Sequence, residues 1–195
     1  MNLRSFLFKN RSYTPIPIVL SILYFSQLIY PFWAYGAVFI TLGELIRLNA
    51  VRYAGGRTRT TNVGANSLCT SGPYSRTRNP LYIGNLFIYS GVVLLSGGIY
   101  MFHLLAIVIF YFIFQYSMII SLEEEKLSII FGQNYLKYKD NVPRIIPLII
   151  PWDNKSRLKP IPILKTLKTE KRTLQNIFLL VLIIISKPYF INFKF

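Results

Sequence analysis

The sequence predicts an all-α membrane protein, a polytopic helical bundle with about five transmembrane helices. Three observations support this fold class. Hydrophobic residues make up 53% of the 195 residues and charged residues only 15%, whereas soluble domains carry about 25% charged residues. The mean hydropathy is +0.42. The apolar residues gather into runs separated by basic connections, and the length fits a single membrane domain over residues 1–195.

The first two apolar runs predict a helical hairpin. Residues 14–30 form the first run and residues 32–48 the second, with Pro31 at the turn between them. Each run has 17 residues, near the lower limit of about 17–25 for a helix that spans a bilayer. Glu44 and Arg47 fall in the last turns of the second run, so we expect this end to lie in the headgroup region.

Two further runs predict a second hairpin, and a fifth run predicts a C-terminal helix. Residues 81–96 lead through Gly97-Gly98 into residues 99–122, which are long enough to span a bilayer with some tilt. The fifth run begins with residues 177–185 and is interrupted by Lys187-Pro188. It reaches spanning length only if the last residues of the chain stay near the interface.

The basic residues predict which face of the bilayer carries the chemistry. The net charge is +15, and 20 of the 22 Lys and Arg lie before the first run, between Arg47 and Arg78, or between Lys126 and Arg172. The positive-inside rule places all three segments in the cytoplasm. The outer connections are too short for a site, so we expect the site to face the cytoplasm. A basic cytoplasmic face accounts for the charge. No nucleic-acid-binding module is visible, so nucleic acid is not an expected partner.

The residue types exclude several other classes of protein. Cys69 is the only cysteine, which excludes a scaffold stabilised by disulfides. Cys69 and His103 are the only soft metal ligands, so we expect no metal site. No G-x-G-x-x-G motif follows a strand, so a Rossmann-type nucleotide site is not expected.

The two long cytoplasmic connections contain the motifs from which a site could be built. Residues 72–84 read GPYSRTRNPLYIG, and residues 123–147 read EEEKLSIIFGQNYLKYKDNVPRIIP. The second stretch is amphipathic at helical spacing, so we expect it to lie against the membrane surface or the end of the bundle. Its apolar side comprises Leu127, Ile130, Phe131, Tyr135 and Tyr138.

These two stretches resemble the isoprenylcysteine carboxyl methyltransferase family and the related membrane phospholipid methyltransferases. The family pattern is Gly-Pro-Tyr/Phe, Arg-His/Asn-Pro-x-Tyr, a hydrophobic hairpin, Glu-Glu, Phe-Gly-x-x-Tyr-x-x-Tyr and Val-x-Arg. All of these elements occur here in this order, although Asn79 stands where many members carry His. The resemblance divides the chain into an N-terminal hairpin with a basic loop (1–71), a catalytic region (72–147), and a basic connector with a C-terminal helix (148–195).

The resemblance implies a methyltransferase of the bacterial inner membrane that uses S-adenosylmethionine, bound at the cytoplasmic mouth of the bundle. This cofactor is a zwitterion, for which Glu123 and Glu124 offer acceptors and Arg78 offers a bidentate carboxylate donor. Gly72 allows close backbone approach, and Pro80 starts the third helix, whose free N–H groups favour anions. The expected cofactor-binding residues are Gly72, Pro73, Tyr74, Arg78, Asn79, Pro80, Tyr82, Glu123 and Glu124. The expected catalytic residues are Glu124 and Arg144, the latter for an acidic or phosphate-bearing acceptor.

The acceptor is expected to be lipid-borne or otherwise partitioned into the membrane, and its chemistry stays open. A carboxylate, as in a prenyl-cysteine, needs no general base, and a dry site favours its attack on the sulfonium. A phospholipid amine must first lose a proton, for which Glu123, Glu124 and Glu125 are the local candidates. This slightly favours a carboxylate. Outside enzymes, the alternative is a scaffold or transporter subunit, although the helices carry little charge besides Glu44, which argues against transport.

The hairpin at Gly97-Gly98 predicts that the ends of the third and fourth helices form one pocket. At about 1.5 Å per residue, two straight helices would leave Glu123 about 12 Å beyond Leu81. Tilt of the longer helix would reduce this offset. We therefore expect the side chains of Glu123 and Arg78 to face the same pocket.

Overall fold

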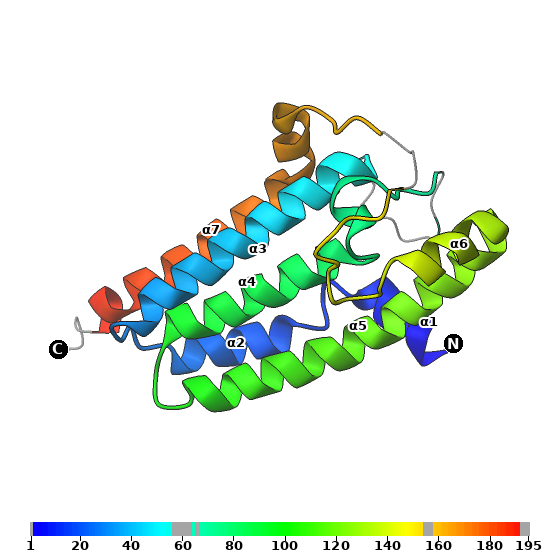
Figure 1. The fold of residues 1–195 in the computed structure, drawn as a ribbon. Helices are drawn as coiled ribbons and strands as arrows, with labels where there is room; N and C mark the ends of the chain where they lie inside the picture. The colour runs from blue at the N-terminus through cyan, green and yellow to red at the C-terminus, as the bar shows by residue number, and fades with distance from the viewer. Residues whose placement is uncertain (1, 56–63, 65–66, 154–157, 192–195) are drawn as a thin grey trace.

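The computed structural model describes residues 2–55, 64, 67–153 and 158–191, which form helices and loops without a β-strand. The helices are α1 (Leu3–Asn10), α2 (Ile16–Phe25), α3 (Phe32–Ala54), the short 3-10 helix η1 (Gly72–Ser75), α4 (Pro80–Ser96), α5 (Met101–Phe131), α6 (Gln133–Asn141) and α7 (Ile163–Ile191). Figure 1 shows an elongated bundle, with α1 and α6 at one end and the turn between α4 and α5 at the other. The all-α class predicted from the sequence is confirmed for the described residues.

Two of the described helices, α3 and α5, are long and apolar enough to cross a membrane. The apolar helices α2 and α4 are shorter, with 10 and 17 residues. The longest of all, α5, has 31 residues, which corresponds to about 46 Å at 1.5 Å per residue. It therefore extends well beyond a hydrocarbon core of about 30 Å. The apolar part of α5 ends at Leu122, and the acidic residues that follow lie outside it.

Helices α3 and α4 pack backbone against backbone through glycines. Gly36 and Gly43 of α3 face Gly91 and Gly84 of α4, each pair separated by seven residues in its own helix. A Cβ atom at Gly91 would lie 2.8 Å from the carbonyl oxygen of Gly36, and one at Gly84 would lie 2.8 Å from that of Gly43. Small residues allow such close approach between membrane helices. This contact fixes the position of α4, which begins at the candidate site.

The first predicted helix, over residues 14–30, is shorter in the structure. Helix α2 ends at Phe25, and the chain then turns so that the Gln27 amide donates to the Ser96 carbonyl at 2.7 Å. The Nζ group of Lys187 donates to the Leu23 carbonyl at 2.9 Å, which satisfies a free acceptor at the end of α2. The apolar sequence continues beyond this point, so hydropathy alone does not reveal where the helix ends.

The predicted C-terminal helix is longer than its apolar run. Helix α7 begins at Ile163, well before residues 177–185, and it continues through Lys187-Pro188. This pair interrupts the apolar run but not the helix, and the Nζ group of Lys187 donates to carbonyl groups at the end of α2. The polar first half of α7 includes the fully buried side chains of Thr166 and Glu170.

The amphipathic stretch after the acidic residues packs mainly as predicted, against the end of the bundle. Helix α5 continues to Phe131, and Gly132, with φ 50°, separates it from α6. Tyr135 and Tyr138 of α6 are buried in a small apolar cluster that also includes Leu127 and Phe131. The remaining member of the expected apolar side, Ile130, is 51% exposed, so it does not join this cluster.

Candidate functional site

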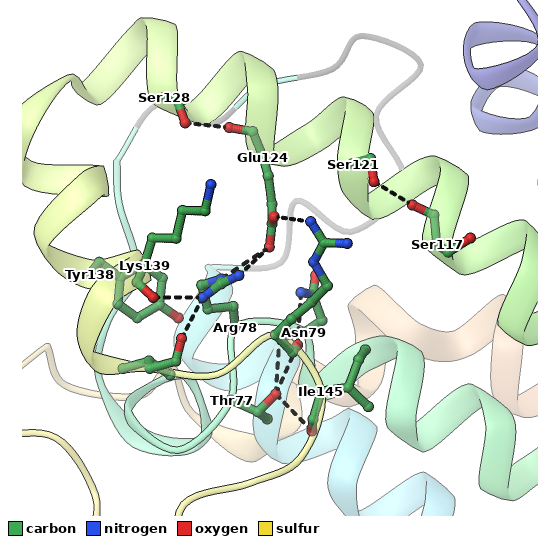
Figure 2. Close-up of polar contacts among 12 residues, drawn as sticks. Thr77, Arg78, Asn79, Ser117, Ser121, Glu124, Ser128, Tyr138, Lys139 and Ile145 are labelled. Atoms are coloured by element: carbon green, nitrogen blue, oxygen red, sulfur yellow. Dashed lines mark hydrogen bonds and ion pairs between the residues drawn. The ribbon is translucent and has the colours of Figure 1, made fainter.

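Two loops far apart in the sequence fold together over the start of α4. The amide of Arg78 donates to the Pro143 carbonyl at 3.0 Å, and the amide of Leu148 donates to the Arg76 carbonyl at 2.9 Å. The Thr77 hydroxyl donates to backbone carbonyls of the 143–152 segment, as Figure 2 shows. These backbone and side-chain bonds make one rigid unit out of the two sequence motifs.

Glu124 is the centre of this unit. Its Oε1 accepts from Nε and Nη2 of Arg78 at 3.0 and 2.8 Å, and its Oε2 accepts from Nη2 of Arg144 at 2.6 Å. The side chains of Glu124 and Arg78 are 7% and 9% exposed, whereas that of Arg144 is 43% exposed. Figure 2 shows Arg78 pointing toward Glu124 across the space between the first loop and α5. Glu124 therefore joins both loops to α5.

All three guanidinium nitrogens of Arg78 have partners inside the protein. Besides Glu124, its Nη1 donates to the carbonyls of Lys139 and Val142 at 2.9 and 2.5 Å. These two carbonyls lie at the end of α6, where a cation is favoured by the helix dipole. Arg78 therefore holds α6 and α5 against the first loop. Arg144 is less enclosed than Arg78. In the described part of the chain its Nη2 donates to Glu124, and 43% of its side chain is exposed.

Glu123 faces a different side of α5 from Glu124, because successive helical residues point about 100° apart. Its Oε2 accepts a hydrogen bond from the Tyr82 hydroxyl at 3.0 Å. Burial raises the pKa of Glu123 to about 7, and the neighbouring charge of Glu124 acts in the same direction. The hydrogen bond from Tyr82 and the positive charge of Arg11 partly oppose this shift. A carboxyl group in this state changes its charge near neutral pH.

The remaining expected cofactor-binding residues have structural contacts. Gly72 and Pro73 form the first turn of η1, and a Cβ atom at Gly72 (φ +60°) would overlap the ring of Tyr53. The Tyr74 carbonyl accepts from the Tyr138 hydroxyl at 2.8 Å. The side-chain amide of Asn79 donates to the Arg144 carbonyl at 3.0 Å. Asn79 occupies the N-cap position of α4, which begins at Pro80, but its side chain makes no capping bond.

The structure thus brings the two ends of the α4–α5 hairpin together. The Tyr82 hydroxyl donates a hydrogen bond to Glu123, and Arg78 forms an ion pair with Glu124. The offset of about 12 Å estimated for straight helices does not separate these groups, because the long side chains of Tyr82 and Arg78 reach across. The described side-chain contacts form two neighbouring sets on different sides of α5: Arg78, Asn79, Glu124 and Arg144 make up one, and Tyr82 with Glu123 makes up the other. Gly72, Pro73 and Tyr74 lie on the adjoining turn.

Helix α1 is part of the site and was not predicted. Leu7 and Phe8 are buried against α5, in a cluster that also includes the ring of Tyr82. Arg4 forms an ion pair with Glu125 at 3.0 Å. The sequence carries a short indication of this helix. Asn2 is a typical N-cap residue, and the residues after it include apolar side chains at helical spacing.

A group of buried polar residues inside the bundle was also missed. The sequence placed Glu44 and Arg47 in the headgroup region, but the side chain of Arg47 is 10% exposed and forms an ion pair with Glu170 of α7. It also donates to Asn85 of α4. No local pattern reveals a pair separated by more than a hundred residues.

Comparison with known proteins identifies the family. Residues 16–134 match the family described as phospholipid methyltransferase. Over 122 residues the chain is 31% identical to the protein-S-isoprenylcysteine O-methyltransferase of Xenopus laevis. That similarity covers 58% of this chain and 40% of the relative, so the chain matches less than half of the relative's length. No solved structure matches the chain. The family match spans more than half of the sequence and includes α4, α5 and the acidic residues of the site, so the chain belongs to the phospholipid methyltransferase family.

Proposed function

We propose that this protein transfers a methyl group from S-adenosylmethionine to a lipid-borne acceptor, at the end of the bundle where α1, α4, α5 and α6 meet. We further propose that this end faces the cytoplasm. The observation that carries the proposal is the pair of adjacent carboxylates, the partly buried Glu123 and the buried Glu124, whose partners lie on both motif loops and on α4. The cofactor would supply an electrophilic methyl group, which needs an aligned nucleophile and little covalent help from the protein.

The residues present suit a zwitterionic cofactor. A carboxylate is needed for its ammonium or ribose hydroxyl groups, and a cation for its carboxylate. Glu123 is a partly buried acceptor, and Arg144 is a partly exposed cation only 2.6 Å from Glu124. Arg78 suits the direct role expected from the sequence less well, because its three nitrogens are bonded within the protein. In this proposal, Arg78 and Glu124 hold the loops in place while Glu123 and Arg144 contact the ligands.

The surroundings of Arg144 favour a lipid-borne acceptor. The segment that follows it is held by Arg76, whose carbonyl accepts from the Leu148 amide. Even so, Ile146 and Ile149 are 79% and 92% exposed on this ordered segment. Apolar side chains held outward beside a cation suit an acceptor with a hydrocarbon tail and an anionic end. A carboxylate acceptor agrees with the relative, whose name describes methylation of isoprenylcysteine.

A phospholipid amine is the second candidate, and the state of Glu123 favours it. An amine must lose a proton before it attacks, and the best general base has a pKa near the working pH. The pKa of Glu123, at about 7, meets this condition, and its carboxyl group lies next to Tyr82 at the proposed reaction site. A carboxylate acceptor would make no use of this property.

The experiment is a methyl-transfer assay with methyl-labelled S-adenosylmethionine and protein reconstituted in vesicles. The acceptors are N-acetyl-farnesylcysteine and phosphatidylethanolamine, each supplied alone. Alkaline treatment releases methanol from a methyl ester and leaves an N-methyl group intact, so it identifies the product. We expect labelled ester from the first acceptor. If phosphatidylethanolamine becomes labelled and the label survives alkali, the result would support a phospholipid amine as the acceptor instead.

Two variants test the site in the same assay. Arg144→Gln should reduce turnover strongly because the acceptor or cofactor loses its cation. Lys137→Gln is the matched control, because Lys137 is an exposed cation of α6 with the same change of charge. Transfer to neither acceptor by the folded wild type would refute the proposed function.

A further inference from the structure

Buried charged groups cross the interior of the bundle away from the motif loops. Arg47 of α3 forms an ion pair with Glu170 of α7, whose side chain is fully buried, and it donates to Asn85 of α4. Glu44 lies one turn earlier, 3.9 Å from Nε of Arg47. Burying such groups costs more free energy than an apolar contact of similar size. A charged group inside an apolar bundle is therefore a candidate for a functional role.

Contacts continue from Arg47 to the proposed site. The Asn85 side chain lies beside the hydroxyl of Tyr116 on α5. The ring of Tyr116 lies 4.6 Å from that of Tyr82, centroid to centroid. The Tyr82 hydroxyl then donates to Glu123. The path from Arg47 to Glu123 thus runs through neighbouring side chains of α4 and α5.

We propose that Arg47 is a positioning residue, which fixes the Tyr82 hydroxyl on the Glu123 carboxylate through Asn85 and Tyr116, with Glu170 as its counter-ion. The inference deepens the proposed function, because it concerns the group placed at the reaction site. It also gives a role to α7, which lies beyond the sequence motifs and the matched residues 16–134.

Direct electrostatic action of Arg47 on Glu123 does not explain the arrangement. The groups that face Glu123 are Tyr82 from α4, Arg11 from the segment after α1, and the adjacent Glu124 of α5. Arg47 instead contacts Asn85 of α4, the helix that carries Tyr82, so we assign its influence on Glu123 to the position of Tyr82. Because the Tyr82 hydrogen bond favours the ionised form of Glu123, loosening this bond should raise the pKa of Glu123.

The experiment is a ¹³C NMR titration of the glutamate side-chain carboxyl carbons in detergent. The chain has five glutamates, and Glu123→Gln assigns the signal of interest. The key variant is Tyr116→Phe, which keeps the ring against Tyr82 and removes the hydroxyl beside Asn85. Tyr111→Phe is the matched control, because the buried Tyr111 hydroxyl has no hydrogen-bond partner in the described part of the chain.

We expect Tyr116→Phe and Arg47→Gln to move the titration midpoint of Glu123 up by about half to one pH unit, the scale of one net hydrogen bond. Tyr111→Phe should leave the midpoint unchanged. If Glu123 titrates in Tyr116→Phe with the same midpoint as in the wild type, the proposal is overturned. This variant gives the answer even if Arg47→Gln fails to fold. If Tyr116→Phe shifts the Glu123 midpoint but the wild-type protein does not bind S-adenosylhomocysteine, the positioning role stands and the proposed function is refuted. The failure of one proposal can therefore be told from the failure of the other.

Discussion

Glu124→Gln should destabilise the protein far more than Glu125→Gln, which removes the same charge at the next residue. Glu124→Gln deletes the counter-ion of Arg78, and both side chains are less than 10% exposed. Removing one partner of a buried ion pair costs about 3–5 kcal/mol, because the other charge stays buried. Glutamine keeps one acceptor oxygen, so we expect the lower end, about 3 kcal/mol. The half-exposed Arg144 contact adds at most about 1 kcal/mol.

Glu125→Gln provides the matched control. It deletes the ion pair with Arg4, whose side chains are 35% and 57% exposed, and such pairs contribute about 0.2–1 kcal/mol. The assay is equilibrium unfolding in mixed detergent micelles, followed by circular dichroism. Equal unfolding free energies for the Glu124 and Glu125 variants would refute the assignment of Glu124 as the buried centre of the site.

Three further predictions address packing, pH and the loops. Gly91→Ala places a Cβ atom 2.7 Å from the Ile40 amide nitrogen, and should cost about 1–3 kcal/mol by overpacking in the same unfolding assay. Because the pKa of Glu123 is raised from 4.5 to about 7 in the folded state, its contribution to stability is complete below pH 4.5 and is lost as pH rises to about 7. Thermal unfolding should show this decline in the wild type but not in Glu123→Gln. Tyr138→Phe removes the hydrogen bond to the Tyr74 carbonyl and should lower the unfolding free energy by about 1 kcal/mol, with faster amide exchange in the first loop.

The parts of the fold that could be predicted are those with local signals. Apolar runs and the Gly97-Gly98 turn were sufficient to place the α4–α5 hairpin, because two glycines with positive φ end one helix and allow the next to return. The order of motifs on either side of this hairpin likewise indicated that Arg78 and Glu124 belong to one site. Their direct ion pair was not predicted, because sequence reasoning treated both as ligands for the cofactor.

The parts that could not be predicted depend on tertiary contacts. The first half of α7 is too polar to be recognised as a buried element, yet Glu170 is fully buried because it meets Arg47. The end of α2 is set by Ser96 and Lys187 from distant helices rather than by its own sequence. A helix as short as α1 gains its stability from packing against α5, which periodicity in eight residues cannot reveal.

Calorimetric titration of the purified protein with S-adenosylhomocysteine in detergent tests the cofactor site most directly. We expect saturable binding by the wild type and by Lys137→Gln. We expect the affinity of Glu123→Gln to be about ten- to a hundredfold lower, the effect of one charge-assisted hydrogen bond. No binding by folded wild-type protein, or equal affinity in the Glu123 variant, would contradict the assignment of Glu123, at the end of the α4–α5 hairpin, as a cofactor ligand.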